Sequence, residues 1–208
     1  MPFDPDAVMW SSSESERAGK PLLVLLHGYG SHEGDLFGLT PYLPLEFAVA
    51  SVRAPEQGPM GGFQWYPIPV EADGTARLDG ATDEFAAWLR DARGDAPSVG
   101  LLGFSQGGSI SIQTLRRHPG LADYAVVLSG LMGPDADPGD DALAASRPPV
   151  FWGRGTADVV IDDARVARLA GWLPGHTDLT ERVYEGLGHS VSEAELADVV
   201  DFLRARLA

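Results

Sequence analysis

The fold is decided by the stretch Val99-Gly100-Leu101-Leu102-Gly103-Phe104-Ser105-Gln106-Gly107-Gly108. It begins as the short apolar run of a buried strand, and a helical pattern follows it over residues 106–117. A serine between glycines at a strand-to-helix turn is the pattern of a nucleophile elbow, where a Cβ at the glycine positions would collide with neighbouring backbone. The alternative is a glycine-rich turn whose serine caps the helix. The strand and helix context favours the elbow, with Ser105 as nucleophile.

Short β-branched or leucine-rich runs alternate with helical segments on both sides of this stretch. The predicted strands are 22–26, 47–52, 99–104, 125–128, 150–152 and 179–184. The predicted helices are 81–93, 106–117, 162–172 and 192–207, the last opened by a capping box of Ser192 and Glu195. This alternation predicts the α/β class, a mostly parallel sheet with helices on both faces, as one domain over residues 1–208. Ligands then bind at the carboxyl ends of the strands.

A serine hydroxyl needs a base to take its proton, and five histidines are available. His189, in Gly186-Leu187-Gly188-His189-Ser190, lies between the last predicted strand and the last helix. It also comes last, as the order serine, acid, histidine requires in this class of fold. His118 ends a helix, where a cation is favourable, and His176 is expected in a surface loop. His189 is therefore the predicted base.

The acid that orients the base should follow a strand between the serine and the histidine. Asp158, in Gly153-Arg154-Gly155-Thr156-Ala157-Asp158, fits this position after the strand at 150–152. Asp162 and Asp163 compete with it, but they stand where a helix begins and are favoured as caps. A further acidic cluster, Asp135, Asp137, Asp140 and Asp141, is expected to be solvated and lacks the spacing of a calcium-binding loop.

Two backbone N–H groups are predicted to stabilise the oxyanion of a tetrahedral intermediate. One belongs to Gln106, the residue after the nucleophile, and the other to Tyr29, in the turn that follows the strand at 22–26. His27 opens that turn and is expected to brace the loop by hydrogen bonding.

Composition excludes several other functions. The chain of 208 residues carries a formal charge of −15, which disfavours binding to nucleic acid or anionic membrane. It contains no cysteine, so disulfides and thiolate metal sites are excluded. The N-terminus is acidic where a signal peptide would be basic, so a cytoplasmic protein is expected.

Four segments together resemble the bacterial phospholipase/carboxylesterase family, which includes carboxylesterases and acyl-protein thioesterase-like enzymes. They are Leu26-His27-Gly28-Tyr29-Gly30, Gly103-Phe104-Ser105-Gln106-Gly107-Gly108, Gly153-Arg154-Gly155-Thr156-Ala157-Asp158 and Gly186-Leu187-Gly188-His189. The resemblance implies a compact α/β hydrolase with a minimal lid or none, without metal or cofactor, acting on carboxylic ester or thioester bonds. It supports Ser105, Asp158 and His189 as triad and Tyr29 and Gln106 as oxyanion donors. The chain departs from the family at Val159, where proline is expected after the acid.

Apolar residues near the predicted site are candidates for a substrate pocket. They are Met60, Phe63, Trp65, Leu131, Met132 and Val159. Together they favour esters with short to medium acyl chains or aromatic esters, although each side chain could simply pack its own loop. A thioesterase or lysophospholipase-type acyl hydrolase is the alternative, and a non-catalytic binding module on the same fold is a second one. The sequence does not set the oligomeric state; the apolar segment 60–66 could serve as a homodimer contact or as a pocket wall.

Overall fold

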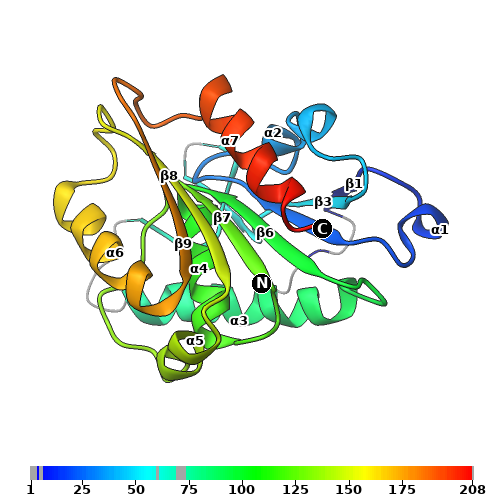
Figure 1. Ribbon diagram of the computed structural model, residues 1–208, viewed down its shortest axis with the longest axis horizontal. Helices are drawn as coiled ribbons and strands as arrows, with labels where there is room; N and C mark the ends of the chain where they lie inside the picture. The colour runs from blue at the N-terminus through cyan, green and yellow to red at the C-terminus, as the bar shows by residue number, and fades with distance from the viewer. Residues whose placement is uncertain (1–3, 5–6, 60, 69–73, 208) are drawn as a thin grey trace.

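The computed structural model describes residues 4, 7–59, 61–68 and 74–207. Its main feature is a seven-stranded sheet in the order β1-β3-β2-β6-β7-β8-β9, in which only the edge pair β1–β3 is antiparallel (Figure 1). The strands are β1 (Val8–Trp10), β2 (Leu22–Leu26), β3 (Ala48–Val52), β6 (Val99–Phe104), β7 (Tyr124–Leu128), β8 (Pro149–Gly155) and β9 (Asp178–Tyr184). The short strands β4 (Glu56–Gln57) and β5 (Phe63–Gln64) form a separate antiparallel pair.

Helices cover both faces of this sheet (Figure 1). The helical segments are α1 (Glu14–Arg17), α2 (Gly34–Phe37), η1 (Thr40–Tyr42), α3 (Gly74–Ala92), α4 (Gln106–Arg117), α5 (Asp140–Ser146), α6 (Asp163–His176) and α7 (Glu193–Arg204). Apolar side chains of α3, α4, α5 and α6 share one core cluster, and those of α2 and α7 share the other. In β2, Val24 and Leu26 join the first cluster, whereas Leu23 and Leu25 join the second. This two-sided burial explains the unbroken apolar run of the strand.

The direction in which successive strands are added to the sheet reverses beside β2. The chain passes from β2 to β3 on one side and then returns to place β6 on the other side. In open α/β sheets, the carboxyl ends of strands at such a reversal are where ligands bind. The turn after β2 begins at His27, and the turn after β6 contains Ser105. Two of the predicted site segments therefore meet at the reversal.

The expected α/β class is confirmed, and so are the two central strands with their predicted limits. Helix α3 differs, because it begins at Gly74 rather than at residue 81. Glycines at 74 and 80 lower the helix propensity of this part of the sequence, but the side chain of Leu78 is buried in the core. Strand β1 was not predicted, because three residues are too few to show an alternating pattern.

A helix that crosses a bilayer needs about 20 consecutive, predominantly apolar residues. Among the residues that the structure describes, no helix combines the necessary length and hydrophobicity.

Candidate active site

Ser105 occupies a strained turn between β6 and α4. Its backbone has a φ of 53° and a ψ of −114°, a conformation that costs free energy in a residue with a Cβ. Gly103 and Gly107 make the turn possible. A Cβ on Gly103 would lie 2.2 Å from the carbonyl oxygen of Gly107, and a Cβ on Gly107 would lie 1.9 Å from that of Leu26. The Ser105 side chain makes no capping hydrogen bond to α4, so the alternative of a helix-capping serine does not hold.

The Ser105 hydroxyl instead lies at the end of a chain of hydrogen bonds. His189 Nε2 is 2.9 Å from Ser105 Oγ, and His189 Nδ1 is 2.7 Å from Asp158 Oδ2. An ionised carboxylate can only accept, so Nδ1 carries the proton and Nε2 is free to accept from the serine. The structure thus brings together three residues that lie far apart in the sequence, in the orientation that a nucleophile, a base and an acid require.

Local backbone hydrogen bonds keep Asp158 ionised. Its Oδ1 accepts from the backbone N–H groups of Val160 at 2.9 Å and Ile161 at 3.1 Å. Burial of the carboxyl opposes ionisation, but the hydrogen bonds from His189 and these two N–H groups outweigh it and hold the pKa of Asp158 below its ordinary value. Val159, at the position where proline was expected, is 94% exposed and leaves this arrangement intact.

The loops that carry Asp158 and His189 are tied to each other through their backbones. Ala157 N–H donates to the carbonyl of Leu187 at 2.9 Å, and Gly186 N–H donates to Thr156 Oγ1, also at 2.9 Å. Gly155 allows the close approach, since a Cβ there would lie 1.9 Å from the Leu187 oxygen. The acid and the base are therefore positioned together, because the loops that follow β8 and β9 are bonded to each other.

The turn after β2 packs against the serine turn. A Cβ on Gly28 would lie 3.5 Å from Ser105 Cβ, so the backbone approaches the nucleophile closely. The backbone N–H groups of Tyr29 and Gln106, the predicted oxyanion donors, have no acceptor among the described residues. Both remain available to a ligand, which is what an oxyanion site requires.

His27 braces this turn, as predicted. It is fully buried, its Nε2 accepts from Ala54 N–H at 3.0 Å, and its Nδ1 donates to the carbonyl of Gly28 at 2.8 Å. Burial lowers the pKa of His27, so the ring is neutral and acts as a fixed structural link.

The side chain of Gln106 has a second role that the sequence did not reveal. Its Oε1 accepts from the backbone N–H of Trp65 at 2.8 Å, and its Nε2 donates to the carbonyl of Tyr66 at 2.7 Å. The indole N–H of Trp65 in turn donates to the carbonyl of His27 at 2.9 Å. Gln106 thus fixes the segment after β5 onto the serine turn. The only signal in the sequence was an amide side chain beside the nucleophile, which does not identify its partners.

The six predicted pocket residues have different environments. Trp65 is 1% exposed and Met132 is 5% exposed, and both belong to the core cluster shared with α3, α4, α5 and α6, so they offer almost no surface to a substrate. Phe63 and Leu131 are partly exposed and Val159 is fully exposed. Met60 lies outside the described residues.

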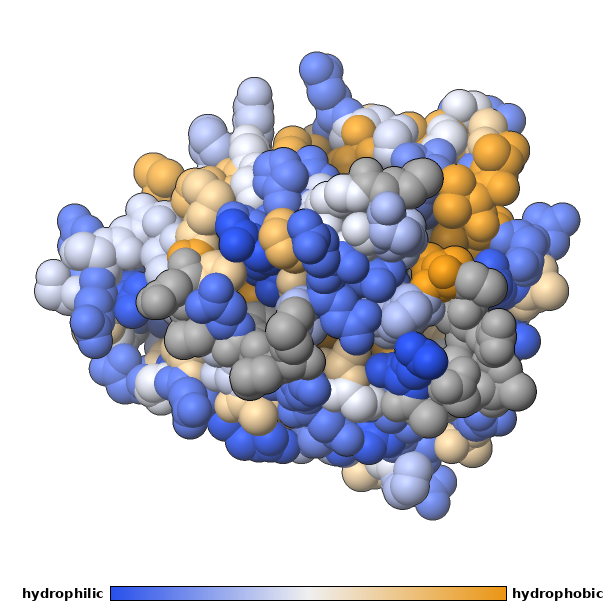
Figure 2. Space-filling view, turned by 180° about the vertical axis from the view of Figure 1, so that it is seen from behind, coloured by the Kyte–Doolittle hydropathy of each residue, from blue (hydrophilic) through white to orange (hydrophobic). Residues whose placement is uncertain are grey.

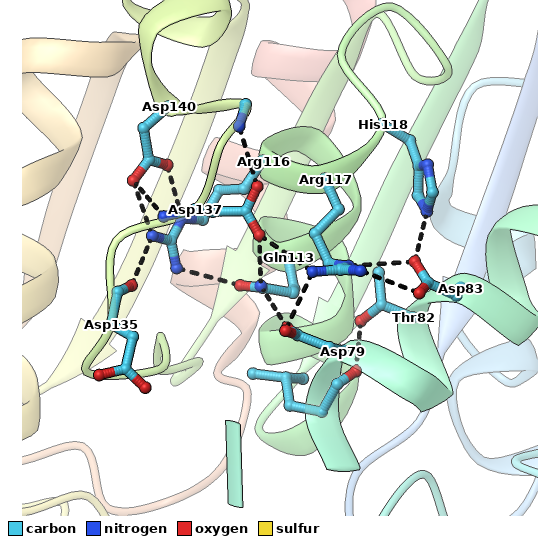
Figure 3. A network of polar contacts seen from close by, with 12 residues as sticks. Asp79, Thr82, Asp83, Gln113, Arg116, Arg117, His118, Asp135, Asp137 and Asp140 are labelled. Carbon is cyan, nitrogen blue, oxygen red and sulfur yellow. Dashed lines mark hydrogen bonds and ion pairs between the residues drawn. The ribbon is translucent and has the colours of Figure 1, made fainter. Parts of the chain in front are cut away.

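The acidic cluster after β7 is solvated only in part: Asp135 and Asp141 are exposed as expected, whereas the other two aspartates are not. Asp137 and Asp140 have side chains only 6% and 15% exposed, because the two arginines at the end of α4 pair with them (Figure 3). Arg116 is buried and donates two hydrogen bonds of 2.8 Å to Asp140, while Arg117 contacts Asp137 at 3.3 Å. The cluster therefore anchors the loop that leaves β7 near the site. Within the described part of the chain, no group of three or more His, Asp or Glu side chains is arranged to hold a metal ion.

A mostly parallel sheet with a Ser105–His189–Asp158 hydrogen-bond chain at its carboxyl edge defines the class of the protein: it is an α/β hydrolase of the serine type. The family model for Phospholipase/Carboxylesterase matches residues 11–207, and the chain belongs to this family.

Individual relatives support the same assignment. Esterase YpfH of Escherichia coli (strain K12) is 26% identical over 202 residues, which cover 91% of this chain and 84% of that protein. Acyl-protein thioesterase 1 of Candida albicans is 36% identical over 110 residues, covering 49% of this chain and 47% of the relative. Among solved structures, esterase PE8 superimposes with a TM-score of 0.80 at 26% identity, covering 99% of each chain.

Proposed function

We propose that this protein is a carboxylesterase that uses Ser105, His189 and Asp158 as its catalytic triad. The observation that carries the proposal is the continuous hydrogen-bond chain through these residues, with distances of 2.9 and 2.7 Å. The strained backbone of Ser105 supports it, since the side chain does not cap α4 and backbone strain of this kind is typical of functional sites.

In the proposed reaction, Ser105 Oγ attacks the ester carbonyl carbon while its proton passes to His189 Nε2. The C–O bond to the alcohol then breaks, and His189 gives the proton to the departing oxygen. This leaves an acyl group on Ser105. A water molecule attacks the acyl carbon, its proton passes to His189, and the Ser105 oxygen recovers that proton as the carboxylic acid leaves. Asp158 stays ionised throughout and stabilises the protonated imidazole.

The oxyanion of each tetrahedral intermediate would be held by the N–H groups of Tyr29 and Gln106. Two features support this role. Both N–H groups are unpaired among the described residues, and Gly28 allows the turn that contains Tyr29 to pack against Ser105. Removal of one such donor typically costs about a hundredfold to a thousandfold in kcat.

The proposed substrates are small neutral esters with short to medium acyl or aromatic groups. Exposed apolar side chains at Val159 and Val160, directly after the acid, and partly exposed Phe63 and Leu131 support an apolar contact surface. Anionic substrates are disfavoured by the formal charge of −15. The face of the molecule seen in Figure 2 is accordingly dominated by hydrophilic residues, with separate hydrophobic patches.

A thioesterase activity is the second candidate, because the chemistry is the same and one relative is named an acyl-protein thioesterase. The two are separated by comparing kcat/KM for an ester and a thioester that carry the same acyl group. A higher value for the ester supports the carboxylesterase; a higher value for the thioester supports the alternative.

The test of the proposal is the hydrolysis of 4-nitrophenyl esters of increasing acyl length by the wild-type protein and by Ser105→Ala. Ser111→Ala is the matched control, because Ser111 lies in α4, the helix that directly follows Ser105, and its hydroxyl donates to the carbonyl of Gly107. We expect Ser105→Ala to lose activity by at least about a thousandfold and Ser111→Ala to keep it. Equal turnover by the wild type and Ser105→Ala would contradict the proposal and favour a non-catalytic binding module.

A further inference from the structure

Glu195, in the first turn of α7, is a buried acid without a hydrogen-bonding partner. The residue is 1% exposed, and neither carboxyl oxygen contacts solvent or bonds to any described residue. The predicted capping box is only half formed. Ser192 Oγ accepts from Glu195 N–H at 3.1 Å, but the Glu195 carboxyl makes no return hydrogen bond to Ser192. A buried polar group of this kind requires an explanation.

The carboxyl is turned toward the sheet, where it lies against Gly153 of β8. A Cβ at position 153 would lie 2.2 Å from Glu195 Oε1 and 3.2 Å from its Cδ. The glycine therefore leaves the room that the carboxyl occupies, and a larger residue at 153 would push α7 away from the strand.

This contact joins the strand that precedes the acid loop and the helix that follows the base loop. Gly153 lies five residues before Asp158 on β8, and Glu195 lies six residues after His189, in the helix that the histidine loop enters. Gly153 also accepts a hydrogen bond from Ser129 N–H through its carbonyl, so its own position is fixed by the sheet and the adjoining loop. The Glu195 side chain thus fills the space between α7 and β8 at this point, and further along the helix Phe202 packs on Phe151 of the same strand.

The surroundings of the carboxyl disfavour its charged form. Burial raises the pKa of Glu195 to about 7, the negative charge of Asp198 acts in the same direction, and the nearby N–H of Ser192 only partly opposes them. From β8 it is faced by Gly153 and Phe151, which carry no charge.

The charged and polar groups of β9 are engaged elsewhere. Tyr184 OH donates to Asp198 at 2.8 Å, and Arg182 is 3.8 Å from the same aspartate. His189 and Asp158 pair with each other. No described cation is therefore paired with Glu195.

We propose that Glu195 is a positioning residue for the triad, whose neutral carboxyl, seated over Gly153, holds α7 against β8 and so keeps His189 in register with Asp158 and Ser105. The inference rests on the proposed function. Loss of the Glu195 proton to solvent would leave an unpaired charge in a buried site, which is relieved only if the carboxyl moves out and the first turn of α7 shifts. A shift of His189 by about 1 Å is enough to cost about a hundredfold in rate. Activity should therefore decline as pH rises above neutrality.

The first test is the pH profile of kcat and KM for a 4-nitrophenyl ester between pH 5.5 and 9. Glu195→Gln keeps the shape of the side chain but cannot ionise, so we expect near wild-type kcat at pH 6 and no alkaline decline. Glu193→Gln, an exposed neighbour in the same turn, is the matched control and should retain the wild-type profile. An unchanged alkaline decline in Glu195→Gln would overturn the proposal.

The second test is a double-mutant cycle at pH 6. Gly153→Ala should lower kcat by about tenfold to a hundredfold with little change in KM, because its Cβ displaces the carboxyl and with it α7. Glu195→Ala should lower kcat less, and the double variant should recover activity relative to Gly153→Ala alone. Losses that simply multiply would contradict the proposed contact. Circular dichroism is used to check that each variant is folded. If Gly153→Ala does not fold, the pH profile of Glu195→Gln alone decides the question.

Failure of this inference is distinguishable from failure of the proposed function. If the wild type neither hydrolyses esters nor reacts with a fluorophosphonate at Ser105, the proposed function is wrong, and so is the positioning role of Glu195. If the wild type does both and the Glu195 variants show the wild-type pH profile, only the positioning role is wrong.

Discussion

Replacing Asp158 by asparagine is the most informative single change, because the structure determines how the new side chain must lie. One carboxyl oxygen of Asp158 accepts from two backbone N–H groups, those of Val160 at 2.9 Å and Ile161 at 3.1 Å. In Asp158→Asn, the amide oxygen must stay on these donors, since the NH₂ group would meet two N–H groups there. The amide NH₂ therefore faces His189 Nδ1, at the position now occupied by an acceptor 2.7 Å away.

The imidazole can avoid this clash of donors only by moving its proton to Nε2. Nε2 then cannot accept the proton of Ser105. We expect kcat to fall by about 10³- to 10⁴-fold, or roughly 4–5 kcal/mol of transition-state stabilisation, with KM within about threefold. The assay is steady-state hydrolysis of 4-nitrophenyl butyrate at pH 7.5, together with the rate of fluorophosphonate labelling, which should fall in parallel.

Asp163→Asn is the control, because Asp163 is an exposed residue nearby in the first turn of α6. It should retain wild-type kcat. A loss of less than tenfold in Asp158→Asn, with the protein folded, would refute the assignment of Asp158 as the residue that orients His189.

Three further predictions concern the turn, the buried charges and the pH dependence of stability. Gly107→Ala would bring its Cβ to 1.9 Å from a carbonyl oxygen of β2, so we expect a loss of several kcal/mol in the free energy of unfolding or no folded protein, measured by urea denaturation. Asp140→Ala would leave the buried Arg116 without its bidentate partner and should cost about 3–5 kcal/mol in the same assay; a loss below about 1 kcal/mol would contradict the buried pairing. The pKa of Glu195 is raised from the ordinary glutamate value of 4.5 to about 7, so its contribution to stability is full below pH 4.5 and is lost as pH rises through 7. The loss is roughly 3 kcal/mol, and Glu195→Gln should remove this part of the pH dependence in denaturation curves recorded from pH 4 to 8.5.

Most of the sheet was predictable because its five inner strands, β2, β3, β6, β7 and β8, are almost entirely buried. The unbroken apolar runs at 22–26 and 99–104 predicted the two central strands with their observed limits. The weaker elements depended on tertiary contacts. Helix α3 starts at Gly74 because Leu78 is drawn into the core, and no local preference of a segment with two glycines would indicate that.

The candidate site was predictable where the chemistry requires particular residues in a particular order. Ser105, Asp158 and His189 follow strands in the order that this fold demands, and the structure places them within hydrogen-bonding distance. Residues that act through packing were not predictable. Trp65 looked like a pocket residue because it is large and apolar, yet its indole is buried and bonds the carbonyl of His27.

The role of Glu195 was also not predictable from the sequence, because it depends on packing. A serine followed three residues later by glutamate predicts a capping box, but the carboxyl instead lies against Gly153, on a strand distant in sequence. The position of the Glu195 carboxyl follows only from the packing of α7 on β8.

Covalent labelling gives the strictest test of Ser105 as the nucleophile of a serine hydrolase. The wild-type protein and Ser105→Ala are incubated with a fluorophosphonate, digested and mapped by peptide mass spectrometry. We expect one stoichiometric adduct, on Ser105, formed as ester hydrolysis is lost, and no adduct in Ser105→Ala. An adduct on a different residue, or equal labelling of both proteins, would contradict this role of Ser105.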